Sequence, residues 1–416
     1  MRRRDFLAYT AAAGGLALCP LGSRGWAIQN PNAGKERLVV IFLRGAVDGL
    51  NVVIPYTDHN YYTMRPSIAI ARPGQAKGAL DLDGRFGLHP GLQSLMPAWK
   101  ERSLAFVHAS GSPDGSRSHF EAQAYMESGT PGVKITPDGW MNRLLASLPG
   151  QHAPTEAVNF GPTLPKILAG RIPVASVPTH ERGYKHGRRG MDAPEQDAST
   201  NAIFDRMYTG ADAISVAYRD GRQAQTQIMS DLARDMTEAA AGAPSPKGFA
   251  DDAAKLCELM RQDPTIQLAF FGLSGWDTHV REGGSEGQLA NHLKALGDGL
   301  AQFHTGLRDI YGRTVVLVIS EFGRTARENG NGGTDHGHGN AMWVMGGPVS
   351  GGKIYGKWPG LDEEELHEGR DLAVTTDFRS VAAAVVQHHL RLGNSSITGI
   401  FPHSDAPPLA DLIRTA

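Results

Sequence analysis

The chain has 416 residues, of which 41% are hydrophobic and 20% are charged, and this balance excludes wholesale disorder. Lysine and arginine number 41 against 43 aspartates and glutamates, so the formal charge of −2 argues against nucleic-acid binding by charge alone. Glycine accounts for 51 of the 416 residues, a larger share than the usual value of about 7%. This abundance predicts many tight loops between regular elements.

The N-terminal segment, residues 1–27, is predicted to be an export signal. Arg3 and Arg4 followed by Phe6 and Leu7 resemble the twin-arginine motif, which directs folded proteins out of the cytoplasm. The apolar run behind them is too short to cross a bilayer, so we expect no stable membrane span. We expect cleavage near position 27 and a periplasmic or secreted protein; a disordered basic N-terminus is the alternative.

Four continuous apolar runs are typical of strands that are covered on both faces. Between them, apolar residues repeat at intervals of three and four over 253–260 and 289–310, which indicates amphipathic helices. The alternation of strands and helices predicts an α/β fold with a mostly parallel sheet covered by helices on both faces. The predicted strands are 38–43, 104–108, 266–271 and 314–319.

No convincing break divides the chain after the export signal, so we expect a single domain over 37–416. Residues 183–200 are polar and lack periodicity, which favours an exposed loop or lid. We therefore expect a loop and helical insertion at about 181–245 within that domain.

Acidic and imidazole side chains follow three of the predicted strands, and others lie in a nearby loop. The carboxyl ends of parallel strands share one edge of a sheet, where ligands bind. Carboxylates and imidazoles suit Zn²⁺, Mn²⁺, Mg²⁺ or Ca²⁺, so we expect one or two divalent ions there. Each residue alone could instead cap a helix, form a turn or make a structural ion pair. The candidate ligands are Asp48, Asp277, His279, Glu321, Asp335, His336 and His338.

The segment SPDGSRSHFEAQ is a second candidate part of the site. Ser118 would stand at a helix N-terminus, where the helix dipole and free N–H groups favour an anion, and we expect it to be the nucleophile. Arg117 would hold the ester oxygens, and His119 would be a ligand or a proton donor. Ser116 and water are the competing nucleophiles. The alternative with a purely structural role is a capping box, because Ser118 precedes Glu121 by three residues.

The motifs LVVIFLRGAVDGLN, SRSHFEAQ, GWDTH, SEFGRT and GTDHGHGN resemble, in the same order, the exported domain-of-unknown-function family 1501. The resemblance covers about 37–395 and implies an alkaline-phosphatase-like and sulfatase-like core. It implies a metal-binding Asp48 after the first strand, Ser118 as the nucleophile and His338 as the final histidine ligand.

The chain departs from that superfamily pattern in two places. The motif GWDTH offers a shorter Asp277-x-His279 pair, and Glu321-Phe322 stands where an Asp-His pair is expected. Phenylalanine cannot bind a metal, so His336 or a neighbour would replace the missing ligand, or one metal position would be empty.

These features together predict an exported, metal-dependent hydrolase of small anionic phosphate or sulfate esters. The rival hypothesis is a non-catalytic binding or assembly protein that keeps a metal for structure, and the Glu321-Phe322 pair favours this rival. The substrate, the identity of the metal and the oligomeric state do not follow from the sequence.

Overall fold

The computed structural model describes residues 35–150, 152–179 and 205–414. The predicted export signal and the polar stretch 183–200 lie outside these residues, and both stay predictions. Lys35 begins the unit to which all of the described structure belongs.

A nine-stranded sheet forms the centre of this unit. Its strands are β1 (Arg37–Leu43), β5 (Leu104–Gly111), β6 (Ala157–Phe160), β7 (Ala175–Val177), β8 (Leu268–Leu273), β9 (Thr314–Ser320), β10 (Asn340–Gly346), β11 (Lys353–Tyr355) and β12 (Thr376–Asp377). The strand order is β11-β5-β10-β9-β1-β8-β6-β7, with β12 beside β5. Every pairing is parallel except those of β10, which runs antiparallel to β5 and β9. The predicted mostly parallel α/β sheet is confirmed.

Helices cover both faces of the sheet. Side chains of a strand alternate between its faces, and in these strands the side chains on both faces are apolar. In β1, Val39 and Ile41 belong to one apolar cluster, and Val40 and Phe42 belong to another. The first cluster includes buried side chains of α9 (Phe249–Gln262) and α10 (Gln288–Gly306). The second includes those of α5 (His119–Ser128), α6 (Trp140–Ser147), α11 (Phe378–Ala384) and α12 (Asn394–Ile400).

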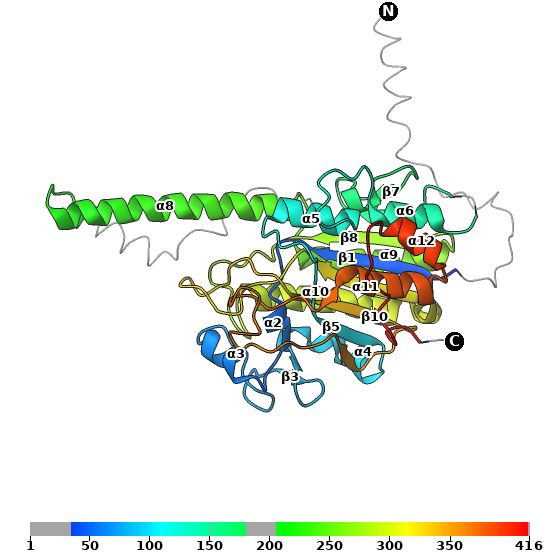
Figure 1. Ribbon diagram of the computed structural model, residues 1–416, viewed down its shortest axis with the longest axis horizontal. Helices are drawn as coiled ribbons and strands as arrows, with labels where there is room; N and C mark the ends of the chain where they lie inside the picture. Colours follow the sequence, from blue (N-terminus) through cyan, green and yellow to red (C-terminus); the bar gives the residue numbers. More distant parts are fainter. Residues whose placement is uncertain (1–34, 151, 180–204, 415–416) are drawn as a thin grey trace, which may run out of the picture. The chain divides into compact units, whose positions relative to one another are not determined.

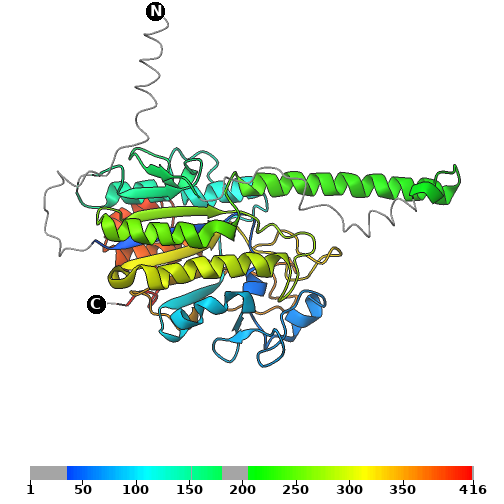
Figure 2. The ribbon, with the colours of Figure 1, turned by 180° about the vertical axis from the view of Figure 1, so that it is seen from behind.

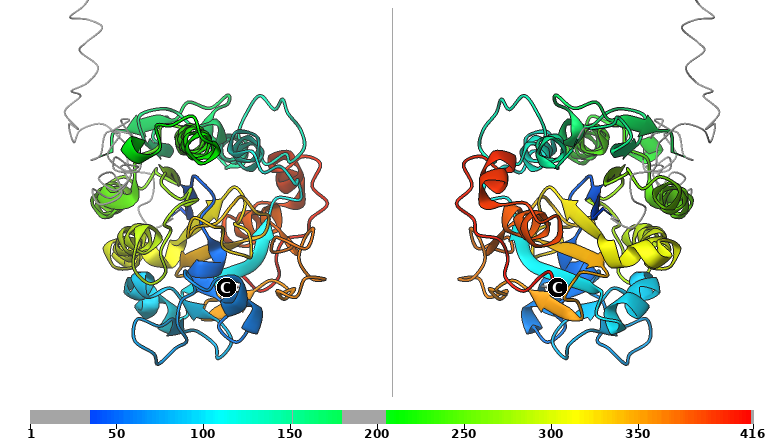
Figure 3. Two further views of the ribbon diagram at one scale, coloured as in Figure 1. Left: turned by 90° about the vertical axis from the view of Figure 1, so that its left-hand side faces the viewer. Right: turned by 90° about the vertical axis from the view of Figure 1, so that its right-hand side faces the viewer.

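The two helical layers can be followed in the figures. Figure 1 shows α11 and α12 on the near side of the sheet, and Figure 2 shows the helices of the opposite layer in front. The end-on views of Figure 3 place the sheet between these layers. The predicted helices at 253–260 and 289–310 correspond to α9 and α10.

The remaining elements lie around the sheet. A small second sheet joins β2, β4 and β3 in that order. The further elements are β2 (Val53–Ile54), β3 (Leu80–Asp81), β4 (Gly87–Leu88), α2 (Gly49–Val52), α3 (His59–Met64), α4 (Met96–Lys100), the 3-10 turns η2 (Pro90–Leu95), η3 (Lys166–Leu168), η5 (Pro246–Gly248) and η6 (Arg308–Arg313), and the π-helical turn η7 (Val385–His389). No helix in the described ranges is both long enough and apolar enough to cross a membrane.

The described part of the predicted insertion contains one long helix, α8 (Ala213–Ala240). The Asp212 side chain caps its start by accepting hydrogen bonds from the Ile214 and Ser215 N–H groups. The helix ends at Ala241, whose φ of 45° breaks the helical conformation. Its C-terminal end lies beside α5 (Figure 1).

Candidate metal centre

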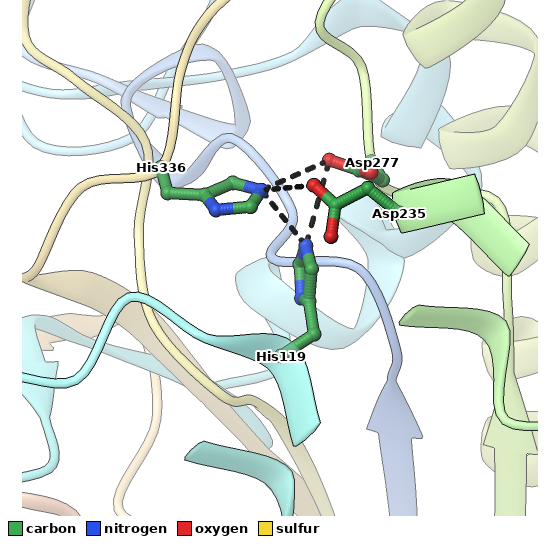
Figure 4. A group of neighbouring side chains, drawn as sticks. All are labelled: His119, Asp235, Asp277 and His336. Atoms are coloured by element: carbon green, nitrogen blue, oxygen red, sulfur yellow. Dashed lines mark hydrogen bonds and ion pairs between the residues drawn. The ribbon is translucent and has the colours of Figure 1, made fainter. Parts of the chain in front are cut away.

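Four side chains from separate elements gather beyond the carboxyl ends of the central strands (Figure 4). His119 opens α5, and Asp277 follows β8. His336 lies in the loop between β9 and β10, and Asp235 comes from α8. One potential ligand atom of each lies within 4.8 Å of those of the other three. This geometry is compatible with a common metal ion.

The imidazoles approach one another through their Nε2 atoms. His336 Nε2 lies 2.9 Å from His119 Nε2 and 2.9 Å from His279 Nε2. Asp277 Oδ1 lies 3.0 Å from His279 Nε2 and 3.4 Å from His336 Nε2. Asp235 Oδ2 completes the set at 3.5 Å from His336 Nε2. His279 thus adjoins the four residues, and the set contains three imidazoles and two carboxylates.

The other nitrogen of each imidazole has an acceptor that fixes the ring. His119 Nδ1 lies 2.7 Å from Glu321 Oε1, and His279 Nδ1 lies 3.3 Å from Asp335 Oδ1. His336 Nδ1 lies 2.9 Å from the carbonyl oxygen of Arg117. A carbonyl or a carboxylate can only accept, so Nδ1 carries the hydrogen and Nε2 of the neutral ring presents a lone pair. Metal-binding histidines typically have such an acceptor at the far nitrogen.

Three lone pairs that face one another at these distances repel unless a cation or a proton lies among them. A proton at His119 can play this part in the absence of a metal. Burial lowers the pKa of the His119 imidazole, but its hydrogen bonds to Asp277 and Glu321 outweigh burial and raise the pKa to about 9.

Asp277 supplies negative charge at the centre of the group. Burial alone would raise its pKa, but the Arg324 guanidinium and the neighbouring imidazoles hold the pKa well below its usual range. Its Oδ1 accepts a hydrogen bond from Arg324 Nη2, whereas its buried Oδ2 has no partner in the described part of the chain. A buried carboxylate oxygen without a partner is costly, whereas Oδ1 is the oxygen through which Asp277 approaches the three imidazoles.

Glu321 orients His119 rather than pointing a free oxygen into the cluster. Its Oε1 accepts hydrogen bonds from Gly45 N at 2.8 Å and from Gln123 Nε2 at 2.9 Å, besides that from His119. Burial would raise its pKa, but the bond and charge of His119 lower it to about 2. Gly45 has a φ of 112°, and a Cβ there would approach Asp277 N to 2.7 Å, so glycine is required where the two loops meet.

Four predicted ligands have other partners in the structure: Glu321 and Asp335 hold the Nδ1 atoms of His119 and His279 instead of joining the donors, and Asp48 and His338 lie apart from the cluster. Asp48 is fully buried and forms a two-bond ion pair with Arg65. Burial would raise the pKa of Asp48, but Arg65 lowers it. The His338 ring stacks on the His367 ring, with the centroids 4.4 Å apart. We therefore no longer assign Asp48 or His338 to the metal centre.

The segment before α5 also differs from expectation. Ser118 is exposed, and its hydroxyl does not cap the helix. Ser116 Oγ, not Ser118, donates to Glu121, over 3.0 Å, so the predicted capping box does not form. The side chain of Arg117 bonds to Asp371 and Glu368 instead of an open site, and its contribution to the cluster is its carbonyl group.

Asp235 was missed by the sequence analysis. It stands in the stretch DLARDM, where a single aspartate on an amphipathic helix has no motif around it. Only its place on the inserted helix, packed beside α5, reveals that it lies near His119, His336 and His279, whose Nε2 is 3.8 Å from its Oδ2.

The family described as "Protein of unknown function (DUF1501)" matches residues 35–401. No curated protein matches the chain. A Vibrio parahaemolyticus protein of the alkaline phosphatase superfamily is similar in structure at 13% identity and a TM-score of 0.37, over 78% of this chain and 63% of that chain.

The lipoteichoic acid synthase LtaP from Listeria monocytogenes is similar at 10% identity and a TM-score of 0.32, over 78% of this chain and 67% of that chain. The chain therefore spans less than two thirds of the Vibrio protein. Similarity at this level carries no argument about the reaction, which has to come from the site.

Proposed function

We propose that this chain, which belongs to the family of proteins of unknown function DUF1501, is an exported hydrolase of small phosphate or sulfate esters that uses one divalent metal ion. The observation that carries the proposal is the convergence of three Nε2 lone pairs with two carboxylates, while each Nδ1 is held by an acceptor.

The donor set favours a transition metal over Mg²⁺ or Ca²⁺. Imidazole nitrogens suit zinc, iron and related metals, and carboxylates also suit manganese, whereas magnesium and calcium prefer oxygen donors throughout. A single ion fits better than two because Phe322 packs against His119 and His336, with ring centroids 4.8 and 5.1 Å away. In the described ranges, no second group of acidic and histidine side chains gathers as closely.

A bound divalent ion supplies Lewis-acid polarisation of an ester and activation of water. The protein's own residues fix where this chemistry takes place. Glu321 and the Arg117 carbonyl keep the hydrogens of His119 and His336 on Nδ1, so both Nε2 atoms face inward. Arg324 keeps Asp277 ionised.

The centre is open to solvent at the side of α8. The Asp235 side chain is 37% exposed and that of His336 is 16% exposed, against 1% for His119 and 4% for Asp277. A small anionic ester would enter there. We assign the attack to water, because Ser118 is exposed and its hydroxyl has no hydrogen bond to the cluster in the described residues.

A second candidate function is a metal-stabilised binding or assembly protein. It is favoured by the number of donors, because five protein groups around a zinc ion, which takes four or at most five ligands, would leave no position for a substrate. In a hydrolase, an ester would displace Asp235 from the metal ion. In a binding protein, Asp235 would stay bound to it.

Hydrolysis assays separate the two functions. Aryl phosphate and aryl sulfate esters are offered to the purified protein while Zn²⁺ or Mn²⁺ is titrated in, and turnover that saturates at one ion per chain supports the hydrolase. Asp277→Asn should abolish turnover. The matched control is Asp298→Asn on α10, where the exposed aspartate pairs with Lys294 and turnover should not change. A stoichiometric metal without turnover of either ester would support the binding protein instead.

A further inference from the structure

A single buried amide side chain joins α8 to the metal centre. Gln123 lies on α5 four residues after His119, so both side chains project from the same face of the helix. Its Nε2 donates to the Ala239 carbonyl over 2.7 Å and to Glu321 Oε1 over 2.9 Å. Its Oε1 accepts a hydrogen bond from Arg44. Both N–H groups and the carbonyl oxygen of this amide are therefore used.

The bond to Ala239 fixes the end of α8 that carries Asp235. The last four carbonyl groups of a helix have no partner within the helix, and Ala239 is in that turn. Asp235 precedes Ala239 by four residues, or about one helical turn. A partner for the Ala239 carbonyl therefore also restricts where Asp235 can lie relative to the histidines.

The bond to Glu321 fixes the other side of the centre. The oxygen that accepts from Gln123 is the same Oε1 that accepts from His119 Nδ1. A shift of this carboxylate would change both the orientation of the His119 ring and the nitrogen that holds its hydrogen. The path from Asp235 to His119 thus runs through Ala239, Gln123 and Glu321.

We propose that Gln123 is a positioning residue that couples α8 to the metal centre, so that Asp235 and His119 reach their ligand positions together. The inference rests on the proposed metal centre and assigns it a structural control: displacement of α8 weakens metal binding through Glu321 as well as through Asp235. Only a side-chain amide offers the two donors and one acceptor that the path requires.

Two substitutions of similar size test the coupling. Gln123→Met keeps the volume but removes every hydrogen bond, and Gln123→Glu keeps an acceptor for Arg44 while placing a second carboxylate against Glu321. Zn²⁺ affinity is measured by competition with a chelator under conditions where each variant is folded. Loss of a direct partner of a metal ligand typically costs 10–100-fold in affinity. Gln123 bonds to Glu321, the partner of His119, and so stands one bond further from the metal. We therefore expect a loss of about 10-fold for Gln123→Met, at the lower end of that range, and a greater loss for Gln123→Glu.

A matched control separates coupling from simple anchoring of the helix. Ser274 Oγ donates to the Ala243 carbonyl just beyond α8, over 2.8 Å, and Ser274 has no bond to Glu321. Ser274→Ala should keep nearly the affinity of the wild type. A loss as great as that of Gln123→Met would show that anchoring alone is responsible, and would overturn the proposal.

A double variant tests the path itself. If Gln123 acts partly through Asp235, the loss in Gln123→Met/Asp235→Asn is smaller than the product of the two single losses. Amide hydrogen exchange at 235–240 should also be faster in metal-free Gln123→Met than in the metal-free wild type. The coupling would be refuted if the double variant lost as much affinity as the product of the two single losses. It would also be refuted if Gln123→Met bound Zn²⁺ as tightly as the wild type. A wild-type protein that binds no Zn²⁺ would refute the proposed function instead, while the exchange measurement would still test the bond to α8.

Discussion

Replacement of Asp48 by asparagine should destabilise the fold while the metal centre stays intact. Asp48 and Arg65 are fully buried and joined by two hydrogen bonds, and Arg65 also donates to the carbonyl groups of Ala326 and Thr325. Removing one member of a buried ion pair typically costs 3–5 kcal/mol, because the other charge is left without compensation.

A neighbouring carboxyl reduces this cost. Burial and the charge of Asp48 raise the pKa of Glu282 well above its usual range, which favours the protonated form of this carboxyl in the native protein. Without the charge of Asp48 this pKa falls, and Glu282 can ionise to compensate Arg65. We therefore expect a loss of about 3 kcal/mol for Asp48→Asn, at the lower end of the range, and a larger loss for Asp48→Asn/Glu282→Gln.

Urea unfolding measures both losses, and metal analysis of the folded variants measures the site. Asp48→Asn should retain its metal. A variant as stable as the wild type would contradict the structural role of the pair. A variant that is stable but has lost the metal would return Asp48 to the ligand set predicted from the sequence.

Three further predictions concern stability, export and the nucleophile. Burial lowers the pKa of His108 to about 4, so its contribution to stability is complete above pH 6.5 and is lost as the pH falls towards 4, by about 1.4 kcal/mol per pH unit. His108→Gln, which can still donate to Val53, should remove this part of the slope in urea unfolding; an unchanged slope would count against it. Replacement of Arg3 and Arg4 by lysine should leave the precursor in the cytoplasmic fraction, and normal export would argue against the twin-arginine signal. Ser118→Ala should leave turnover per folded molecule unchanged, whereas lost turnover with bound metal would restore the serine mechanism.

The fold was predictable where burial itself leaves a pattern. Continuous apolar runs indicated β1, β5, β8 and β9, because a strand that is covered on both faces has no solvent-facing side on which polar residues would alternate with apolar ones. The third of these strands, β8, begins at residue 268, whereas the apolar run begins at 266. The Ile266 N–H donates a hydrogen bond to the Asp263 carbonyl and not to a neighbouring strand. The reversed direction of β10 was not predictable, because apolar composition carries no direction.

The site was predictable where its residues follow strands or, like His119, begin a helix. Asp277, His279 and His336 lie in motifs at strand ends or the adjoining loop, and the structure brings them together. Asp48 occurs in an equivalent motif, but its partner Arg65 comes from a later loop that no pattern connects to it. Asp235 reaches the site from an inserted helix, and such tertiary placement leaves no local signal.

Metal analysis of three purified proteins tests the central claim most directly. The wild type, His336→Gln and His338→Gln differ only in two histidines two positions apart, one of which lies in the cluster while the other stacks on His367. After each is loaded with Zn²⁺ and freed of excess ion, elemental analysis and native mass spectrometry count the ions per chain. We predict one ion in the wild type and in His338→Gln and none in His336→Gln. An ion retained by His336→Gln, or lost from a folded His338→Gln, would contradict the proposed metal centre.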